Sequence, residues 1–148
     1  MDEFSVLLVD DERDFLETLI KRLQRRKLKV TGATSGEEAL RILKEMPPDV
    51  VVLDVRMRGM DGIETLRQIK KISPLVEVIM LTGHANPEVA VEGMELGAFD
   101  YLMKPLNFDE LLYKLEDAYK RKTIQEQKIK YLQERRNWKG LSDEKTTV

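Results

Sequence analysis

Several polar residues of this chain follow directly after apolar runs. The clearest is Asp54, which comes straight after the aliphatic run Val50–Leu53. A carboxylate in such a place is costly unless something pairs with it. Polar residues follow three other apolar runs in the same way: Asp10 and Asp11 after Val6–Val9, Thr82 after Val76–Leu81, and Lys104 after Phe99–Met103.

These residue types could together handle a phosphoryl group. Three carboxylates held close together repel one another, each pair by roughly 4 kcal/mol at 4 Å and an effective dielectric near 20, so they favour a neutralising cation. Oxygen ligands without histidine or cysteine point to a hard ion, and we expect Mg²⁺. A carboxylate can attack phosphorus, while the cation, the Lys104 ammonium and the Thr82 hydroxyl take up the phosphoryl oxygens.

Elements that bring these residues together can be predicted from periodicity. Apolar runs alternate five times with amphipathic stretches, which is typical of a parallel α/β sheet. Strands are predicted at Val6–Val9, Leu28–Ala33, Val50–Leu53, Val76–Leu81 and Phe99–Met103, and helices at 12–26, 36–46, 62–72, 87–96 and from 108 onward.

The composition of the runs predicts the order of the strands. The first, third and fourth runs are apolar at successive positions, as strands covered on both faces must be, whereas the second and fifth mix polar with apolar residues and suit edges. Right-handed crossovers then favour the order 2-1-3-4-5. In that order the carboxyl ends of the strands, with Asp10, Asp11, Asp54, Thr82 and Lys104, share one rim.

Helix ends carry their own signals. We expect N-caps, most with an acid three residues on, and one glycine C-cap. The expected N-caps are Asp11 with Asp14, Ser35 with Glu38, Asp61 with Glu64, Asn86 before Pro87, and Asn107 with Glu110, and the C-cap is Gly97.

Composition limits the class of protein. The 148 residues suit one domain with an extension, and the absence of cysteine excludes disulfides and thiolate chemistry. Without an apolar run near 18 residues or a basic leader, we expect a cytoplasmic protein. Residues 119–148 hold nine Lys/Arg and four Asp/Glu, a net +5, which leaves −7 on residues 1–118.

At four motifs the chain resembles the receiver domain of a two-component response regulator. They are LLVDDE, VVLDVRMRGMDG, VIMLTGHA and GAFDYLMKPLNFDELL, in order and in register over residues 4 to about 118. The resemblance implies a flavodoxin-like (βα)5 fold, a doubly wound α/β sheet, and a domain at 1–118 followed by a basic helical tail or linker at 119–148. One departure is Arg58, where the family commonly has proline, which loosens the loop after Asp54.

The resemblance also implies residue roles. Asp54 would be the phosphoacceptor, Thr82 and Lys104 would hold phosphoryl oxygens, and Lys104-Pro105 would be the cis peptide bond of such domains. Asp10, Asp11, Asp54 and the backbone carbonyl of Arg56 would hold Mg²⁺. Structural alternatives remain: Asp11 could be only a helix cap, and Tyr101 only edge packing.

A histidine kinase or phosphotransfer protein would supply the phosphoryl group. Thr82 and Tyr101 would then form the switch that reshapes the face of the fourth helix, fifth strand and fifth helix, which binds a downstream protein or a second copy, including a phosphorylation-dependent homodimer. Such a protein catalyses its own phosphotransfer and autodephosphorylation but is not a turnover enzyme. We further hypothesise that Arg56 and His84, which flank the phosphate, set its lifetime.

The tail admits several interpretations. A heptad frame gives three polar entries among eight, so a dimerising helix and a solvated one both stay open. Its positions are Leu111, Leu115, Ala118, Lys122, Gln125, Ile129, Leu132 and Arg136. The basic cluster could touch nucleic acid or acidic protein, although charge runs are usually solvated and direct nucleic-acid binding is not expected.

Two other functions must be weighed. We expect a stand-alone receiver, since SDEKTTV resembles a natural polar ending, and the alternative is the receiver end of a longer transcriptional regulator. A metal-dependent phosphatase with an aspartate nucleophile would also combine Mg²⁺, Asp, Thr and Lys. Its nucleophile lies in an Asp-x-Asp pattern after the first strand, whereas Asp10 and Asp11 are adjacent here.

Overall fold

The computed structural model describes residues 3–57, 60–83 and 87–146, with strands and helices in strict alternation. This alternation confirms the predicted α/β class. The strands are β1 (Ser5–Val9), β2 (Lys29–Ala33), β3 (Val50–Asp54), β4 (Glu77–Thr82) and β5 (Asp100–Met103). The helices are α1 (Arg13–Gln24), α2 (Gly36–Glu45), α3 (Gly62–Ile72), α4 (Pro87–Glu95) and α5 (Phe108–Thr146).

The strands form one parallel sheet in the order β2-β1-β3-β4-β5, as predicted. Every residue of β3 and β4 is buried, whereas β2 and β5 carry exposed and half-buried positions. The mixed composition of the second and fifth runs therefore identified the edges correctly, because only an edge strand leaves backbone and side chains near solvent.

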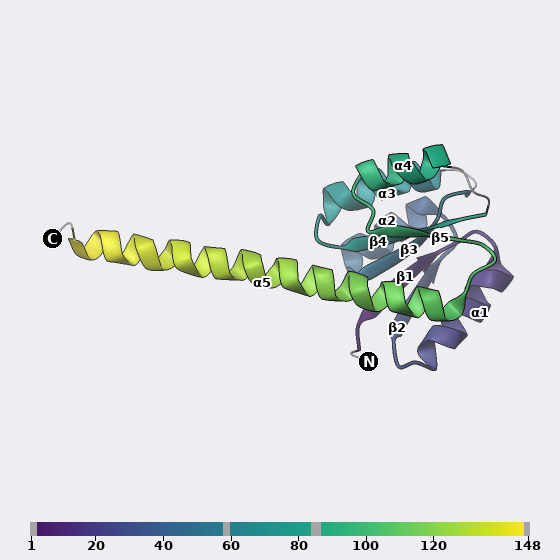
Figure 1. Ribbon diagram of the computed structural model, residues 1–148, viewed down its shortest axis with the longest axis horizontal. Helices are drawn as coiled ribbons and strands as arrows, with labels where there is room; N and C mark the ends of the chain where they lie inside the picture. The colour runs from purple at the N-terminus through teal and green to yellow at the C-terminus, as the bar shows by residue number, and fades with distance from the viewer. Residues whose placement is uncertain (1–2, 58–59, 84–86, 147–148) are drawn as a thin grey trace.

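Helices cover both faces of the sheet (Figure 1). Leucines of α1 and α5 pack with one set of strand side chains, including Val6, Leu8 and Val50. Side chains of α2 and α3 pack with the alternate set, including Leu7, Val51 and Leu53. The chain therefore folds in three layers, and successive strand residues point to opposite faces.

Capping predictions are largely confirmed. Side chains of Ser35, Asp61 and Asn107 accept the backbone N–H three residues on, and Gly97 has a φ of 102° after α4. The Asp11 cap is wrong: Glu12 is the N-cap residue of α1 and makes no side-chain capping bond. The cap expected at Asn86 lies outside the described residues.

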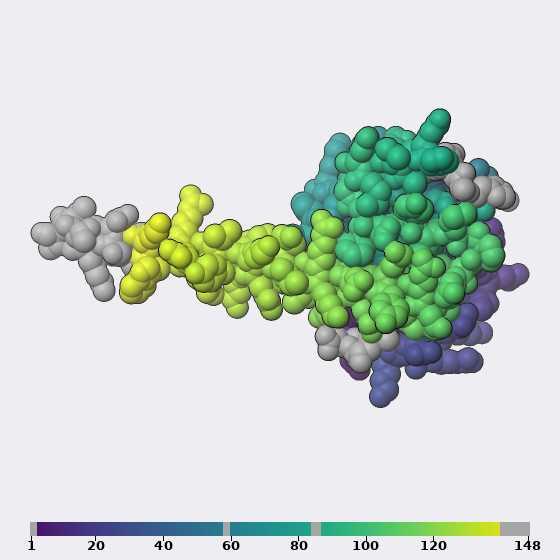
Figure 2. Space-filling view, viewed as in Figure 1, coloured from purple at the N-terminus to yellow at the C-terminus, as the bar shows by residue number. Residues whose placement is uncertain are grey.

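Helix α5 runs across the sheet and far beyond it. Leu111, Leu115 and Ala118 are buried against the sheet, whereas every described side chain from residue 126 to 139 is exposed. Figures 1 and 2 show this distal part standing clear of the body. None of the helices in the described segments combines the length and apolarity needed to cross a bilayer.

Residues near the amino ends of the strands contact the middle of α5. The ring of Tyr119 stacks on Phe4 with centroids 4.6 Å apart. Lys122 Nζ lies 2.6 Å from Asp49 Oδ1, immediately before β3, and Arg121 Nε lies 3.6 Å from Oε2 of the buried Glu77, which begins β4. The first four positions of the heptad frame, Leu111, Leu115, Ala118 and Lys122, are therefore occupied by contacts within the chain.

Candidate functional site

Asp10 and Asp54 lie side by side at the carboxyl ends of β1 and β3. These strands pair with Val9 opposite Leu53, so the aspartates that follow are at the same level. Both are buried, with 2% and 4% of their surface exposed. Each Oδ1 accepts the backbone N–H two residues on, from Glu12 at 2.9 Å and from Arg56 at 3.0 Å. These turn bonds fix the carboxylates and leave each Oδ2 facing the rim.

Asp11 completes an acidic cluster with these two residues. One carboxylate oxygen from each of Asp10, Asp11 and Asp54 lies within 4.8 Å of the others. Asp11 is half-buried, so the cluster opens to solvent on its side. The prediction that the three carboxylates share one rim is thus confirmed.

Lys104 reaches into the cluster from the loop after β5. Its backbone N–H donates to the carbonyl of Thr82 at 2.8 Å, and its peptide bond to Pro105 is cis, as predicted. Lys104 Nζ donates to Asp10 Oδ2 at 2.9 Å and lies 3.7 Å from Asp54 Oδ2. The ammonium therefore pairs more closely with Asp10 than with Asp54.

Burial and neighbouring charge shift the pKa values of Asp54 and Lys104. Burial raises the pKa of Asp54 to about 6; the Arg56 N–H opposes this rise, and the negative charge of Asp10 adds to it. Burial alone would lower the pKa of Lys104, but its hydrogen bond to Asp10 and the charges of Asp10 and Asp54 outweigh burial and raise it. At neutral pH the site thus holds an ammonium beside a carboxylate whose ionised form is partly destabilised.

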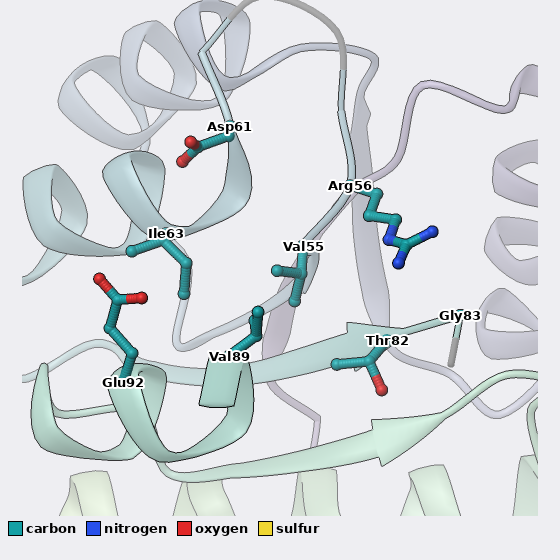
Figure 3. A pocket seen from close by; sticks show the side chains of 8 residues that line it. All are labelled: Val55, Arg56, Asp61, Ile63, Thr82, Gly83, Val89 and Glu92. Atoms are coloured by element: carbon teal, nitrogen blue, oxygen red, sulfur yellow. The ribbon is translucent and has the colours of Figure 1, made fainter. Parts of the chain in front are cut away.

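A pocket of about 310 Å³ adjoins the rim between α3 and α4. Thr82, itself buried, lines it together with Arg56 and Gly83. Asp61 and Glu92 line the acidic end of the pocket, and Figure 3 shows Val55 and Val89 between that end and the rim. Thr82 and Arg56 thus lie at one end of an opening beside the carboxylates.

Tyr101 lies on β5, with its side chain 42% exposed. It lines a groove of about 420 Å³ together with residues of α4, among them Val91 and Met94. An exposed ring beside a groove is compatible with either of the two roles expected for it, a switch or simple edge packing. The remaining expectations for this rim, on His84 and on Arg58, fall outside the described residues.

The family assignment follows from comparison with known proteins. The response regulator receiver domain family matches residues 6–116, three quarters of the chain and all of the rim just described. The chain belongs to this family. As a receiver, it is a member of a family whose proteins are typically signalling proteins of two-component systems and not turnover enzymes.

Relatives of known structure share the receiver fold. A receiver domain protein from Clostridium thermocellum is 37% identical with a TM-score of 0.78, covering 82% of this chain and 98% of that one. NtrX from Brucella abortus is 30% identical with a TM-score of 0.80, covering 85% of this chain but 29% of that one. The fold resemblance therefore extends into α5.

Curated relatives include longer proteins. The transcriptional regulatory protein ZraR of Escherichia coli K12 is 42% identical over 117 residues, which cover 79% of this chain and 26% of ZraR. The DNA-binding transcriptional regulator NtrC of the same strain is 40% identical over 113 residues, 76% of this chain and 24% of NtrC. The receiver thus spans about a quarter of the length of these relatives.

The acidic cluster fits the metal site of a receiver. Its ligand atoms are all oxygens, which suits a hard divalent cation. The charges of Asp10 and Asp11 help to raise the pKa of Asp54, and a bound cation would relieve that repulsion. The three carboxylates are therefore suited to hold such a cation.

Two residues of the site were not singled out from the sequence. Gly62 begins α3, and a Cβ there would lie 2.5 Å from Val55 Cα and 2.6 Å from the Asp54 carbonyl oxygen. A glycine in a first helical turn was the available signal, because other residues favour helix more. The second is Phe15 of α1, whose ring lies under Lys104 Nζ at 4.4 Å.

Proposed function

We propose that this receiver is a phosphorylation-controlled signalling switch in which Asp54 accepts a phosphoryl group from a histidine kinase or phosphotransfer protein. The observation that carries the proposal is the convergence of Asp10, Asp11, Asp54 and Lys104 on one rim. Of the two buried carboxylates, Asp10 Oδ2 is bonded to the ammonium, whereas Asp54 Oδ2 lies beyond hydrogen-bond distance of it. That oxygen is the best placed to act as a nucleophile.

The transfer is a single displacement at phosphorus. An Asp54 carboxylate oxygen forms a bond to phosphorus, and the bond from phosphorus to the donor breaks, with its electron pair leaving on the donor. Lys104 and the Thr82 hydroxyl hold the phosphoryl oxygens. With the pKa of Asp54 at about 6, most Asp54 side chains are ionised and nucleophilic at pH 7.

Mg²⁺ is the cofactor that this site would take. Asp10, Asp11, Asp54 and the backbone carbonyl of Arg56 would hold it. When bound, it supplies positive charge that offsets the crowded carboxylates and the phosphoryl oxygens. The Arg56 N–H already fixes Asp54, so the backbone next to its carbonyl is held in place.

The phosphorylated state would be transmitted through Thr82 and Tyr101. A phosphoryl group adds about two negative charges and draws Thr82 toward it. The space so vacated admits the Tyr101 ring, and the face of α4, β5 and α5 changes shape. We propose that this face, with the groove between Tyr101 and α4, binds the downstream protein or a second copy when Asp54 is phosphorylated.

The wider context has two forms. In one, residues 1–118 form a stand-alone receiver and residues 119–148 a basic tail. The second is the receiver end of a longer transcriptional regulator, favoured by the length of ZraR and NtrC. The reading frame downstream of codon 148 distinguishes the two.

The proposal is tested by incubation with acetyl phosphate and Mg²⁺, followed by intact-mass measurement. We expect one phosphate per chain, slow release through autodephosphorylation, and no incorporation in Asp54→Asn. Continued release of phosphate at a steady fast rate would instead identify the aspartate-nucleophile phosphatase. An inert wild-type protein would contradict both.

A further inference from the structure

The aromatic ring of Phe15 forms one wall of the Lys104 site. Phe15 lies in the first turns of α1, and its half-buried side chain packs against the core cluster of that face. Lys104 Nζ lies 4.4 Å from the ring centroid, over its face. The face of an aromatic ring carries negative potential and attracts a cation at this distance.

The ring complements the two carboxylates around the ammonium. Asp10 Oδ2 lies 2.9 Å and Asp54 Oδ2 3.7 Å from Lys104 Nζ. The Lys104 side chain is only 17% exposed. A lysine ammonium is strongly hydrated and sits on a flexible four-carbon stem, so it needs contacts on several sides to stay in one place.

Phe15 supplies a kind of contact that an aliphatic residue of similar size cannot. Leucine would fill much of the same volume but presents no negative face to a cation. Among the cation–π contacts of the described residues, this is the one made by a lysine of the rim. It is also the one beside the acidic cluster.

From this geometry, and resting on the proposed function, we propose that Phe15 is a positioning residue for phosphotransfer. Its ring holds the Lys104 ammonium within reach of the Asp54 carboxylate, where the ammonium can meet the incoming phosphoryl oxygens. Phe15 itself touches no reacting atom and acts through Lys104.

The kinetic test compares Phe15→Leu with Phe15→Tyr, which keeps the aromatic face. With acetyl phosphate and Mg²⁺, we expect Phe15→Leu to be phosphorylated about tenfold more slowly than wild type and Phe15→Tyr within about twofold of it. Phe99→Leu is the matched control, since it removes a half-buried ring that lies under Arg121. Its rate should equal that of wild type.

A spectroscopic test needs neither Mg²⁺ nor a phosphodonor. The ring current of Phe15 should shift the proton resonances of the Lys104 Cε methylene upfield. We expect this shift in wild type and Phe15→Tyr, and its loss in Phe15→Leu. Phe15→Met serves as the second non-aromatic variant if Phe15→Leu does not fold.

The outcomes separate this inference from the proposed function. Equal rates in wild type and Phe15→Leu, or equal slowing by Phe15→Leu in a Lys104→Ala background, would overturn the positioning role while Asp54 remained the phosphoacceptor. A wild-type protein that takes up no phosphate would overturn the proposed function instead. An unshifted Lys104 methylene in wild type would show that the ring contact itself is absent.

Discussion

Lys104 Nζ lies 3.7 Å from Asp54 Oδ2, outside hydrogen-bond distance, although the two side chains face each other across a buried rim. The ammonium is instead bonded to Asp10. Asp54 therefore carries its charge with incomplete compensation, and its pKa is raised to about 6, chiefly by burial. Because its ionised form is destabilised, the Asp54 carboxylate is more reactive, and its charge lowers the stability of the fold.

Asp54→Asn should stabilise the metal-free protein at pH 7. The folded-state pKa of about 6 is above the ordinary value of 3.8, so ionisation costs the folded state free energy on the order of 3 kcal/mol at neutral pH. We expect a gain in unfolding free energy of about 1–3 kcal/mol, measured by urea denaturation in EDTA.

The pH dependence gives the control for this prediction. As pH falls from 6 toward 3.8, the folded wild type takes up the Asp54 proton before the unfolded chain does, so the wild type gains stability relative to the variant. The advantage of Asp54→Asn should therefore disappear over this range. An advantage independent of pH would show that it does not come from the Asp54 charge.

Gly62→Ala should damage both the fold and the site. A Cβ at residue 62 would meet the backbone of Asp54 and Val55, which cannot move without shifting the end of β3 that carries Asp54. We expect a loss of about 2 kcal/mol or more in unfolding free energy and slower phosphorylation by acetyl phosphate. Gly83→Ala is the matched control for stability, because among the described residues other than its chain neighbours no atom lies within 4 Å of its added Cβ, and it should be nearly neutral.

Tyr101→Ala should accept phosphate normally but should transmit the resulting conformational change poorly. Hydrogen exchange of α4, compared before and after phosphorylation, measures the transmission. We expect the change seen in wild type to shrink in Tyr101→Ala and to persist in Tyr131→Ala, which removes a similarly exposed ring from the tail. An undiminished change in Tyr101→Ala would leave Tyr101 with edge packing only.

Arg56→Ala should shorten the lifetime of the phosphorylated state. Arg56 and Thr82 both line the pocket next to the carboxylates. We expect removal of the Arg56 side chain to open a path for water to the phosphorus. The backbone bond from Arg56 to Asp54 remains, so phosphate uptake should be unaffected. Loss of phosphate is followed by intact mass, with His84→Ala in parallel; identical decay in both variants and wild type would refute the hypothesis.

Lys122→Ala should release the proximal tail from the body. The ion pair between Lys122 and Asp49 is largely shielded from solvent, since the two side chains are 17% and 24% exposed. Loss of this pair should lower the free energy of unfolding by about 1–3 kcal/mol. Hydrogen exchange should increase in residues 119–126. Lys120→Ala removes an exposed lysine two residues away and should change neither quantity.

The sheet was predictable because each clue was local. Unbroken aliphatic runs mark β3 and β4 as central, and the caps at Ser35 and Asp61 mark where α2 and α3 begin. The shared rim follows from the parallel direction of the strands, which all end at one edge of the sheet, and the strand order makes β1 and β3 neighbours. The acidic cluster is therefore predictable from the sequence.

The errors and omissions concern orientation and distant contacts. Asp10 and Asp11 are adjacent, and the sequence does not reveal which of them bonds the backbone at the start of α1; Asp10 does so. The contact between Lys122 and Asp49 joins residues 73 positions apart and depends on the path of α5 across the sheet. The ring of Phe15 reaches Lys104 for the same reason, through the packing of α1.

The path of α5 places the distal part of the helix far from the acidic rim. The helix begins beside the acidic rim, crosses the sheet, and departs near Asp49 at the opposite end. The 24 residues that follow Lys122, up to Thr146, extend about 36 Å outward. A molecule bound at the rim would therefore leave the distal part of α5 accessible to a second molecule.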